Sequence, residues 1–147
     1  MHGNAVLTDS LAIMEYLNDI SISQHLVPKS TKDKYKFRQV LHYGLTAVEP
    51  NLWVADQVSR LGQRYCWPDR ALSEALRQAR HNIAVVWTWV HPRSYLAGDT
   101  FTLVDVFFYY LITWGQQYHI EVPEHVQQYL QGLESRRAFP SEIRGNF

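Results

Sequence analysis

The sequence predicts an all-α protein, a bundle of five to six helices that follows a short strand and a first small helix. The main evidence is spacing, because apolar residues recur at intervals of three and four from Thr31 to about Leu61, as on one face of a helix. Helix-starting residues precede further runs of this kind, and no second strand-like run follows residue 8. The 147 residues suffice for a domain with a core of its own.

The N-terminal part differs from the rest of the chain. Ala5 to Thr8 has the character of a short strand, and Ser10 is a suitable N-cap for the helix that follows it. The serine-containing stretch after this helix is interpreted as a linker. We therefore divide the chain into a strand-and-helix segment (1–20), a linker (21–30) and a helical domain (31–147).

Prolines mark where helices of the helical domain are expected to break or begin. Pro50 lies inside the first helical run, where it removes a backbone donor and clashes with the preceding turn, so we expect a bend or a break near Val48. Pro68 suits the first turn of a second helix. The remaining helices are expected at Pro68–Val90, Thr102–His119 and Pro123–Ser135, with one further helical turn in the tail.

The strongest local signal is a capping box. Thr102 is placed to cap the amide of Asp105, and the Asp105 carboxylate can reach back to the amide of Thr102. Phe101 and Val106 occupy the two positions of a hydrophobic staple around this box. We expect Thr102 and Asp105 to matter for folding rather than for chemistry.

Composition excludes several classes of protein. Lys and Arg together number 14, as do Asp and Glu, so a basic surface for nucleic acid is not expected. The two apolar stretches, 83–90 and 101–114, are too short or too polar to span a membrane. The seven histidines show no metal-ligand spacing, and we expect no metal site. A single cysteine, Cys66, and the lack of a secretory-type start favour a cytoplasmic protein. We expect Cys66 to be buried as a small hydrophobic residue.

Three segments together resemble one protein family. The segment YLAGDTFTLVDV (95–106) is similar to the "yLaGd-x-fTlADi" element of glutathione transferases, and LTDSLAIMEYL (7–17) is similar to their "L-x-[ED]-S-x-A-I-x-x-Y-L" motif. LESRRAFPSEI (133–143) resembles the closing element of the family, with Arg137 in place of the usual proline. The resemblance spans almost the whole chain, and it implies that 1–20 is the remnant of a thioredoxin-like lobe.

The resemblance assigns glutathione binding to Asp9 and Ser10. The hydroxyl of Ser10 and nearby N–H groups at a helix N-terminus can receive a carboxylate, and Asp9 can face an ammonium group. The γ-glutamyl end of glutathione carries both groups. The structural alternative is an ordinary Asp-Ser helix cap. No catalytic residue is assigned, because the thiolate-stabilising residue of the family belongs to a part of the lobe that has no counterpart here.

By position, the resemblance also nominates residues for a pocket that holds the hydrophobic electrophile. In the family this pocket is lined by the middle of the first long helix where it faces the motif-bearing helix. Ordinary core packing explains each nominated residue equally well. The nominated residues are Tyr43, Ala47, Asn51, Phe108 and Trp114.

The resemblance implies a glutathione transferase-like protein, with glutathione as co-substrate and no other cofactor. Its complete form would conjugate the glutathione thiolate to electrophiles, whereas this chain alone is expected to be inactive and Met1 to be an internal residue of a longer frame. The alternatives are a non-catalytic module for protein interaction, as in elongation-factor gamma subunits and aminoacyl-tRNA synthetases, or a truncated product without activity. We expect a homodimer or self-association, because Ile13, Met14 and Leu17 would face water or a partner.

Overall fold

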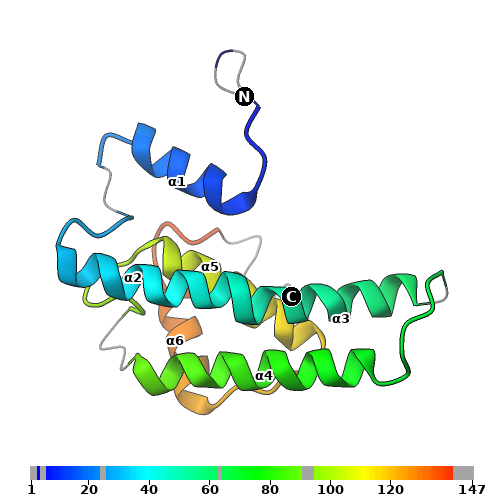
Figure 1. The fold of residues 1–147 in the computed structure, drawn as a ribbon. Coiled ribbons are helices and arrows are strands. Elements are labelled where there is room, and N and C mark those ends of the chain that lie inside the picture. Colours follow the sequence, from blue (N-terminus) through cyan, green and yellow to red (C-terminus); the bar gives the residue numbers. More distant parts are fainter. Residues whose placement is uncertain (1–2, 4–5, 24–25, 63, 91–94, 141–147) are drawn as a thin grey trace.

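The computed structural model describes residues 3, 6–23, 26–62, 64–90 and 95–140. Within these residues the chain forms α-helices, one π-helical segment and no strand, which confirms the all-α prediction (Figure 1). The residues expected to form a strand are described from Val6 to Thr8. They are not paired as a strand, since the described residues include no other strand to accept their hydrogen bonds. The elements are α1 (Ser10–Ile20), α2 (Thr31–Tyr43), the π-helical η1 (Gly44–Val48), α3 (Glu49–Leu61), α4 (Ala71–Trp89), α5 (Leu103–Gln117) and α6 (Glu124–Glu134).

The first long helix, formed by α2, η1 and α3, is continuous but contains a π-helical segment. Figure 1 shows α2 and α3 as one rod, with α4 running beside it. The π-helical segment η1 lies directly before Pro50, which occupies the first turn of α3, so the disturbance expected near Val48 takes the form of a wider turn. A Cβ atom on Gly44 would lie 2.9 Å from ring atoms of Phe107 and of Phe108. Glycine is therefore needed where η1 presses on α5.

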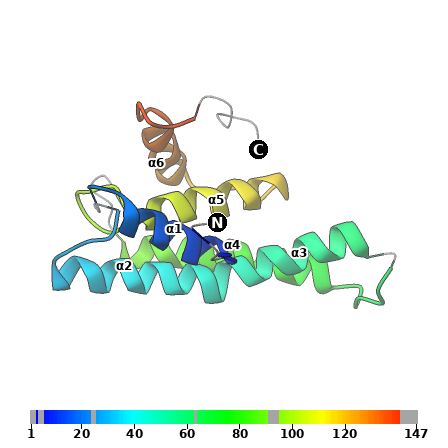
Figure 2. The ribbon, with the colours of Figure 1, turned by 90° about the horizontal axis from the view of Figure 1, so that it is seen from above.

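Helix α5 is the centre of the domain. Figure 2 shows it between α6 and the layer made by α2, α3 and α4. Its side chains are buried on most sides, and those of Phe108, Leu111 and Ile112 are fully inaccessible to solvent. A helix that is apolar nearly all round is typical of a buried position.

The N-terminus of α5 is fixed by a buried carboxylate. Oδ2 of Asp105 accepts hydrogen bonds from the N–H of Thr102 (2.8 Å) and from its hydroxyl (3.0 Å), and the capping box is formed. Oδ1 accepts from the N–H of Leu96 (2.8 Å) and from the hydroxyl of Tyr129 on α6 (2.9 Å). Burial raises the pKa of Asp105, and these hydrogen bonds oppose the rise. One side chain thus ties a loop, α5 and α6 together.

The segment that follows α6 packs back on the loop before α5. Nη1 of Arg136 donates to the hydroxyl of Tyr95 at 2.6 Å, and its guanidinium carbon lies 3.8 Å from the ring centre of Phe101. A guanidinium over an aromatic ring gains a cation–π attraction. Two of the three segments that resemble the family are therefore in direct contact.

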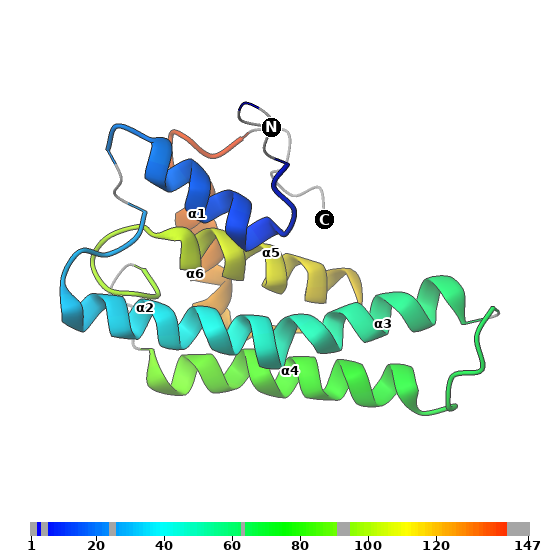
Figure 3. The same cartoon turned by 45° about the horizontal axis from the view of Figure 1, so that its top comes forward.

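Helix α1 is held less firmly. Figures 1 and 3 show it at the edge of the bundle, on the side of α2 and α5. Ile13 and Leu17 are 37% and 54% exposed, as expected, whereas Met14 is half-buried against the core, contrary to expectation. The buried Asn18 anchors the following segment, because its Oδ1 accepts from the N–H of Leu26 at 3.0 Å.

The structure corrects two further expectations, on Cys66 and on the start of α4. Cys66 is exposed rather than buried, since it lies in the loop between α3 and α4 instead of on a helix face. Helix α4 begins at Ala71, three residues after Pro68, whose carbonyl instead accepts from the N–H of Ala71 in a turn. Of the tail after Ser135, where one further helical turn was expected, residues 136–140 form turns rather than a helix, and 141–147 lie outside the described residues. No helix in the described part of the chain is long and apolar enough to cross a bilayer.

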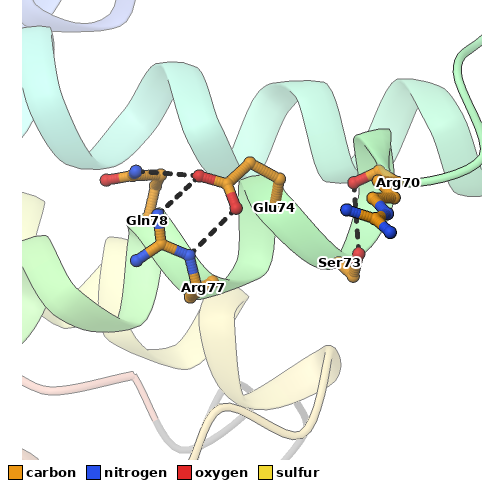
Figure 4. A network of polar contacts seen from close by, with 5 residues as sticks. All are labelled: Arg70, Ser73, Glu74, Arg77 and Gln78. Carbon is orange, nitrogen blue, oxygen red and sulfur yellow. Dashed lines mark hydrogen bonds and ion pairs between the residues drawn. The ribbon is translucent and has the colours of Figure 1, made fainter.

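The outer face of α4 carries an exposed polar network (Figure 4). The Glu74 carboxylate accepts from Nε and Nη2 of Arg77 at 2.9 and 2.6 Å and from the side-chain amide of Gln78 at 2.9 Å. The hydrogen bonds from Arg77 and then Gln78 lower the pKa of Glu74 to about 2. These groups are one turn apart on a solvated surface, so the network supports the helix and indicates no binding site.

Candidate functional site

The N-terminus of α1 has a strained backbone and unpaired donors. Asp9, not Ser10, is the N-cap, and its Oδ1 accepts from the N–H of Ala12 at 3.0 Å. Its φ of 78° and ψ of 125° are unfavourable for any residue other than glycine. In the described part of the chain, the N–H groups of Ser10 and Leu11 and the hydroxyl of Ser10 make no hydrogen bond. Backbone strain of this kind persists where the surrounding structure requires it, often at binding sites.

Two cavities that share Tyr110 as a lining residue, one beside Ser10 and one between α3 and α5, are together called the cleft. Its first part has a volume of about 200 Å³ and its second part about 460 Å³, and Tyr110 lines both. The first part is lined by Ser10, Met14, Glu49, Val106, Phe107 and Tyr110. The second is lined by Trp53, Asp56, Gln57, Arg60, Tyr110, Trp114 and Gln117.

Helical periodicity explains which side chains meet in the cleft. Glu49, Trp53 and Asp56 recur at intervals of four and three along α3, so they share one face of that helix. Tyr110 and Trp114 are four residues apart on the facing side of α5, and their ring centres are 5.5 Å apart. The cleft is therefore formed by one face of each helix.

A carboxyl group lines each part of the cleft, Glu49 the first and Asp56, paired with Arg60, the second. Burial, and then the nearby charge of Asp9, raise the pKa of Glu49. Burial, followed by the charges of Glu49 and Asp56, raises the pKa of the Tyr110 hydroxyl. The carboxylate of Asp56 accepts from Nη1 of Arg60 (3.3 Å) and from the hydroxyl of Tyr118 (2.9 Å). The side-chain carboxyl of Glu49 makes no hydrogen bond or ion pair with the described residues.

The structure does not bring the five nominated pocket residues together. Trp114 lines the cleft. Phe108 is fully buried in the core, where its ring lies 6.5 Å from that of Trp87. The other three residues are engaged elsewhere: Tyr43 donates to Oδ1 of Asn82 on α4 at 3.0 Å, while the Ala47 carbonyl accepts from the side-chain amides of Asn51 and Asn82, both at 2.7 Å.

Sequence reasoning missed the residues that form most of the cleft, Glu49, Trp53, Asp56 and Tyr110. A usable signal was present, because Trp53 and Tyr110 are large rings on helix faces that also carry carboxylates or amides. Such a mixed face is neither a plain core face nor a plain solvated face. Among the described residues, no three His, Cys, Asp or Glu side chains gather as a metal site.

The order of the helices, with α5 buried at the centre of the bundle, is that of a glutathione transferase C-terminal domain. The family model for the glutathione S-transferase C-terminal domain matches residues 54–137. The chain belongs to the glutathione S-transferase family.

Solved structures agree on the fold. A bacterial glutathione transferase, BphK, in a ternary complex, is 17% identical and superposes with a TM-score of 0.78 over 99% of this chain and 70% of its own. A glutathione transferase homolog from sulfitobacter with bound glutathione is also 17% identical, with a TM-score of 0.70 over 99% of this chain and 71% of its own. No curated protein matches the sequence. At this identity the structures show a shared fold.

Proposed function

We propose that the chain is the helical part of a glutathione transferase and binds the γ-glutamyl end of glutathione at Asp9 and Ser10. The observation that carries this proposal is that the unpaired N–H groups of Ser10 and Leu11 lie at the N-terminus of α1, and Ser10 also lines the cleft. A helix N-terminus attracts a carboxylate through its free N–H groups and its dipole. The exposed Asp9 carboxylate is available to the ammonium group, and the cleft beyond Ser10 would hold the electrophile.

Conjugation requires the thiolate of glutathione, and the groups that line the cleft do not favour this charged form of the thiol. Asp9 precedes Ser10 in the chain and Glu49 lines the same cavity as Ser10, and both are carboxyl groups. A nearby negative charge raises the pKa of a thiol rather than lowering it. We therefore propose that this chain does not conjugate by itself and that, in the complete protein, another part supplies the thiolate-stabilising group.

A second proposal concerns interaction. The exposed apolar side chains Ile13, Leu17 and Ile20 lie along α1, at 37%, 54% and 53% exposure. Contiguous exposed apolar surface marks an interface or a tendency to aggregate. A cytoplasmic protein that self-associates through this helix, or a non-catalytic interaction module, is the alternative function that this observation favours.

Amide NMR tests the glutathione site. The ¹⁵N-labelled chain is titrated with glutathione, with γ-glutamylcysteine and with cysteinylglycine. We expect the Ser10 and Leu11 signals to move with the first two compounds and not with the third, and Ser10→Ala to weaken this binding several-fold. Ser73→Ala is the matched control, because Ser73 lies in the first turn of α4, where its hydroxyl donates to the carbonyl of Arg70.

Two results would contradict the proposal. If cysteinylglycine moved these signals as much as glutathione, or if neither did, the γ-glutamyl site would be absent. We also expect this binding to be too weak to hold the purified chain on glutathione resin, and we expect the chain not to conjugate an electrophile. Glutathione-dependent turnover that Ser10→Ala abolishes would show that the helical domain activates the thiol without further residues.

A further inference from the structure

The π-helical turn of the first long helix is contacted by a polar side chain from another helix. The amide of Glu49 donates to the carbonyl of Gly44, five residues back, whereas an α-helix would use the carbonyl four residues back. Pro50 follows and has no N–H, so a backbone carbonyl one turn earlier loses that donor. The side-chain amide of Asn82 on α4 donates to the carbonyl of Ala47 at 2.7 Å. A side chain of α4 thus supplies a donor to the backbone of η1.

Both polar ends of the Asn82 side chain are used. Its Oδ1 accepts from the hydroxyl of Tyr43, the last residue of α2, at 3.0 Å. The carbonyl of Ala47, to which its amide donates, also accepts from the side-chain amide of Asn51 on α3 at 2.7 Å. The ring of Tyr43 packs edge-on against that of Trp89 on α4, with 4.6 Å between ring centres. Asn82 therefore joins the end of α2, the π-helical turn and α4 at one point.

The π-helical turn determines how α3 is rotated relative to α2. Such a turn holds about one residue more than an α-helical turn, and one residue corresponds to about 100° of rotation around the helix axis. With the turn in place, Glu49 lines the first part of the cleft and Trp53 the second. In an uninterrupted α-helix the two side chains would point about 100° away from these directions. The composition of the cleft wall therefore depends on the form of this turn.

We propose that Asn82 is a positioning residue of the cleft: it holds η1 in the π-helical form and thereby keeps Glu49 and Trp53 turned toward the cleft. The close approach of Gly44 to α5 fixes the beginning of the turn, and the hydrogen bond from Asn82 to Ala47 fixes its later part. The proposal concerns the shape of the cleft, and it rests on the proposed function only in that this cleft is the ligand site.

Scalar coupling across hydrogen bonds tests the proposal in the full chain without ligand. NMR measures the coupling between the amide nitrogen of Glu49 and the carbonyl carbon of its acceptor, which is Gly44 in the π-helical turn and Leu45 in an α-helical one. We expect the coupling to Gly44 in the original chain. In Asn82→Leu it should be lost and replaced by a coupling to Leu45, and the indole signal of Trp53 should shift. Asn82→Ala removes the same hydrogen bonds and carries the same expectation if Asn82→Leu does not fold.

The titration of Glu49 is a second readout, which a general loss of stability would not change in the folded protein. Burial, and then the charge of Asp9, raise the pKa of Glu49 in the original chain. When the side chain turns out of the cleft, its pKa should fall toward the ordinary value for an exposed glutamate, as measured from the carboxyl carbon signal.

A matched control separates Asn82 from its helix. Gln78→Leu makes the same chemical change one turn earlier on α4, where Gln78 donates to Glu74, and should leave the coupling and the titration as in the original chain. A Glu49–Gly44 coupling retained in the folded Asn82 variant, or an equal change in Gln78→Leu, would overturn the proposal. None of these measurements uses glutathione, so failure of the glutathione titration would leave this result standing.

Discussion

Asp9 and Asp105 both lie at a helix N-terminus, but they differ in burial and in the number of hydrogen bonds that they accept. Asp105 is fully buried, and its two oxygens accept hydrogen bonds from Leu96, Thr102 and Tyr129. Asp9 is exposed, accepts one side-chain hydrogen bond from the N–H of Ala12, and has a φ of 78°. The N-terminus of α5 is thus saturated by the protein, whereas that of α1 keeps donors free.

This difference separates Asp105, which stabilises the fold, from Asp9, for which we propose a role in binding glutathione. A buried carboxylate that satisfies several donors holds distant segments in register, and its loss leaves those donors unpaired. An exposed cap with a strained backbone contributes little to the core, so the strain has to be explained by something other than packing. The same residue type, in the same local position, therefore indicates function only when the tertiary structure leaves it unsatisfied.

The largest effect should come from removing the buried carboxylate. Asp105→Ala leaves the N–H groups of Leu96 and Thr102 and the hydroxyl of Tyr129 without their acceptor. Each buried unpaired donor costs about 1–3 kcal/mol, so we expect a loss of roughly 3 kcal/mol or more in the free energy of unfolding, measured with urea. Asp9→Ala is the matched control and should cost about 1 kcal/mol, the usual value for an N-cap. Equal losses in the two variants would remove the distinction between the sites.

A comparison of alanine and glycine at each position tests the backbone difference. At position 9, where φ is positive, glycine should be more stable than alanine by about 1 kcal/mol. At position 105, inside α5, alanine should be more stable than glycine by about 0.5–1 kcal/mol. Urea unfolding measures the pair at 105, and amide hydrogen exchange within α1 measures the pair at 9. The same preference at both positions would show that Asp9 is not strained.

The smallest effect is the pH dependence of the buried carboxyl. Burial raises the folded-state pKa of Asp105 above the value of about 3.9 that an unfolded chain has. The folded state then binds the proton more tightly, so the stability linked to this group is complete below the unfolded pKa and is lost as pH rises through the folded pKa. The difference in unfolding free energy between the original chain and Asp105→Asn should therefore fall as pH rises from about 4. A difference that grows with pH would mean that the hydrogen bonds outweigh burial.

The sequence by itself determined the helical class and most of the local structure. Thr102 and Asp105 predicted the start of α5, and Pro50 predicted the irregularity before α3, because capping and proline sterics act over a few residues. The three family-like segments also predicted the glutathione transferase family that the family model matches.

Only the tertiary structure decided which helix faces meet and which polar groups stay unsatisfied. Periodicity shows that Glu49, Trp53 and Asp56 share a face, but not whether that face meets α5 or solvent. For the same reason Tyr43 was expected in a pocket and instead contacts α4. The choice between Asp9 and Ser10 as the cap likewise depended on a backbone angle that residue preferences do not reveal. Local propensities act between near neighbours, whereas the cleft is made by side chains more than fifty residues apart in sequence, such as Trp53 and Tyr110.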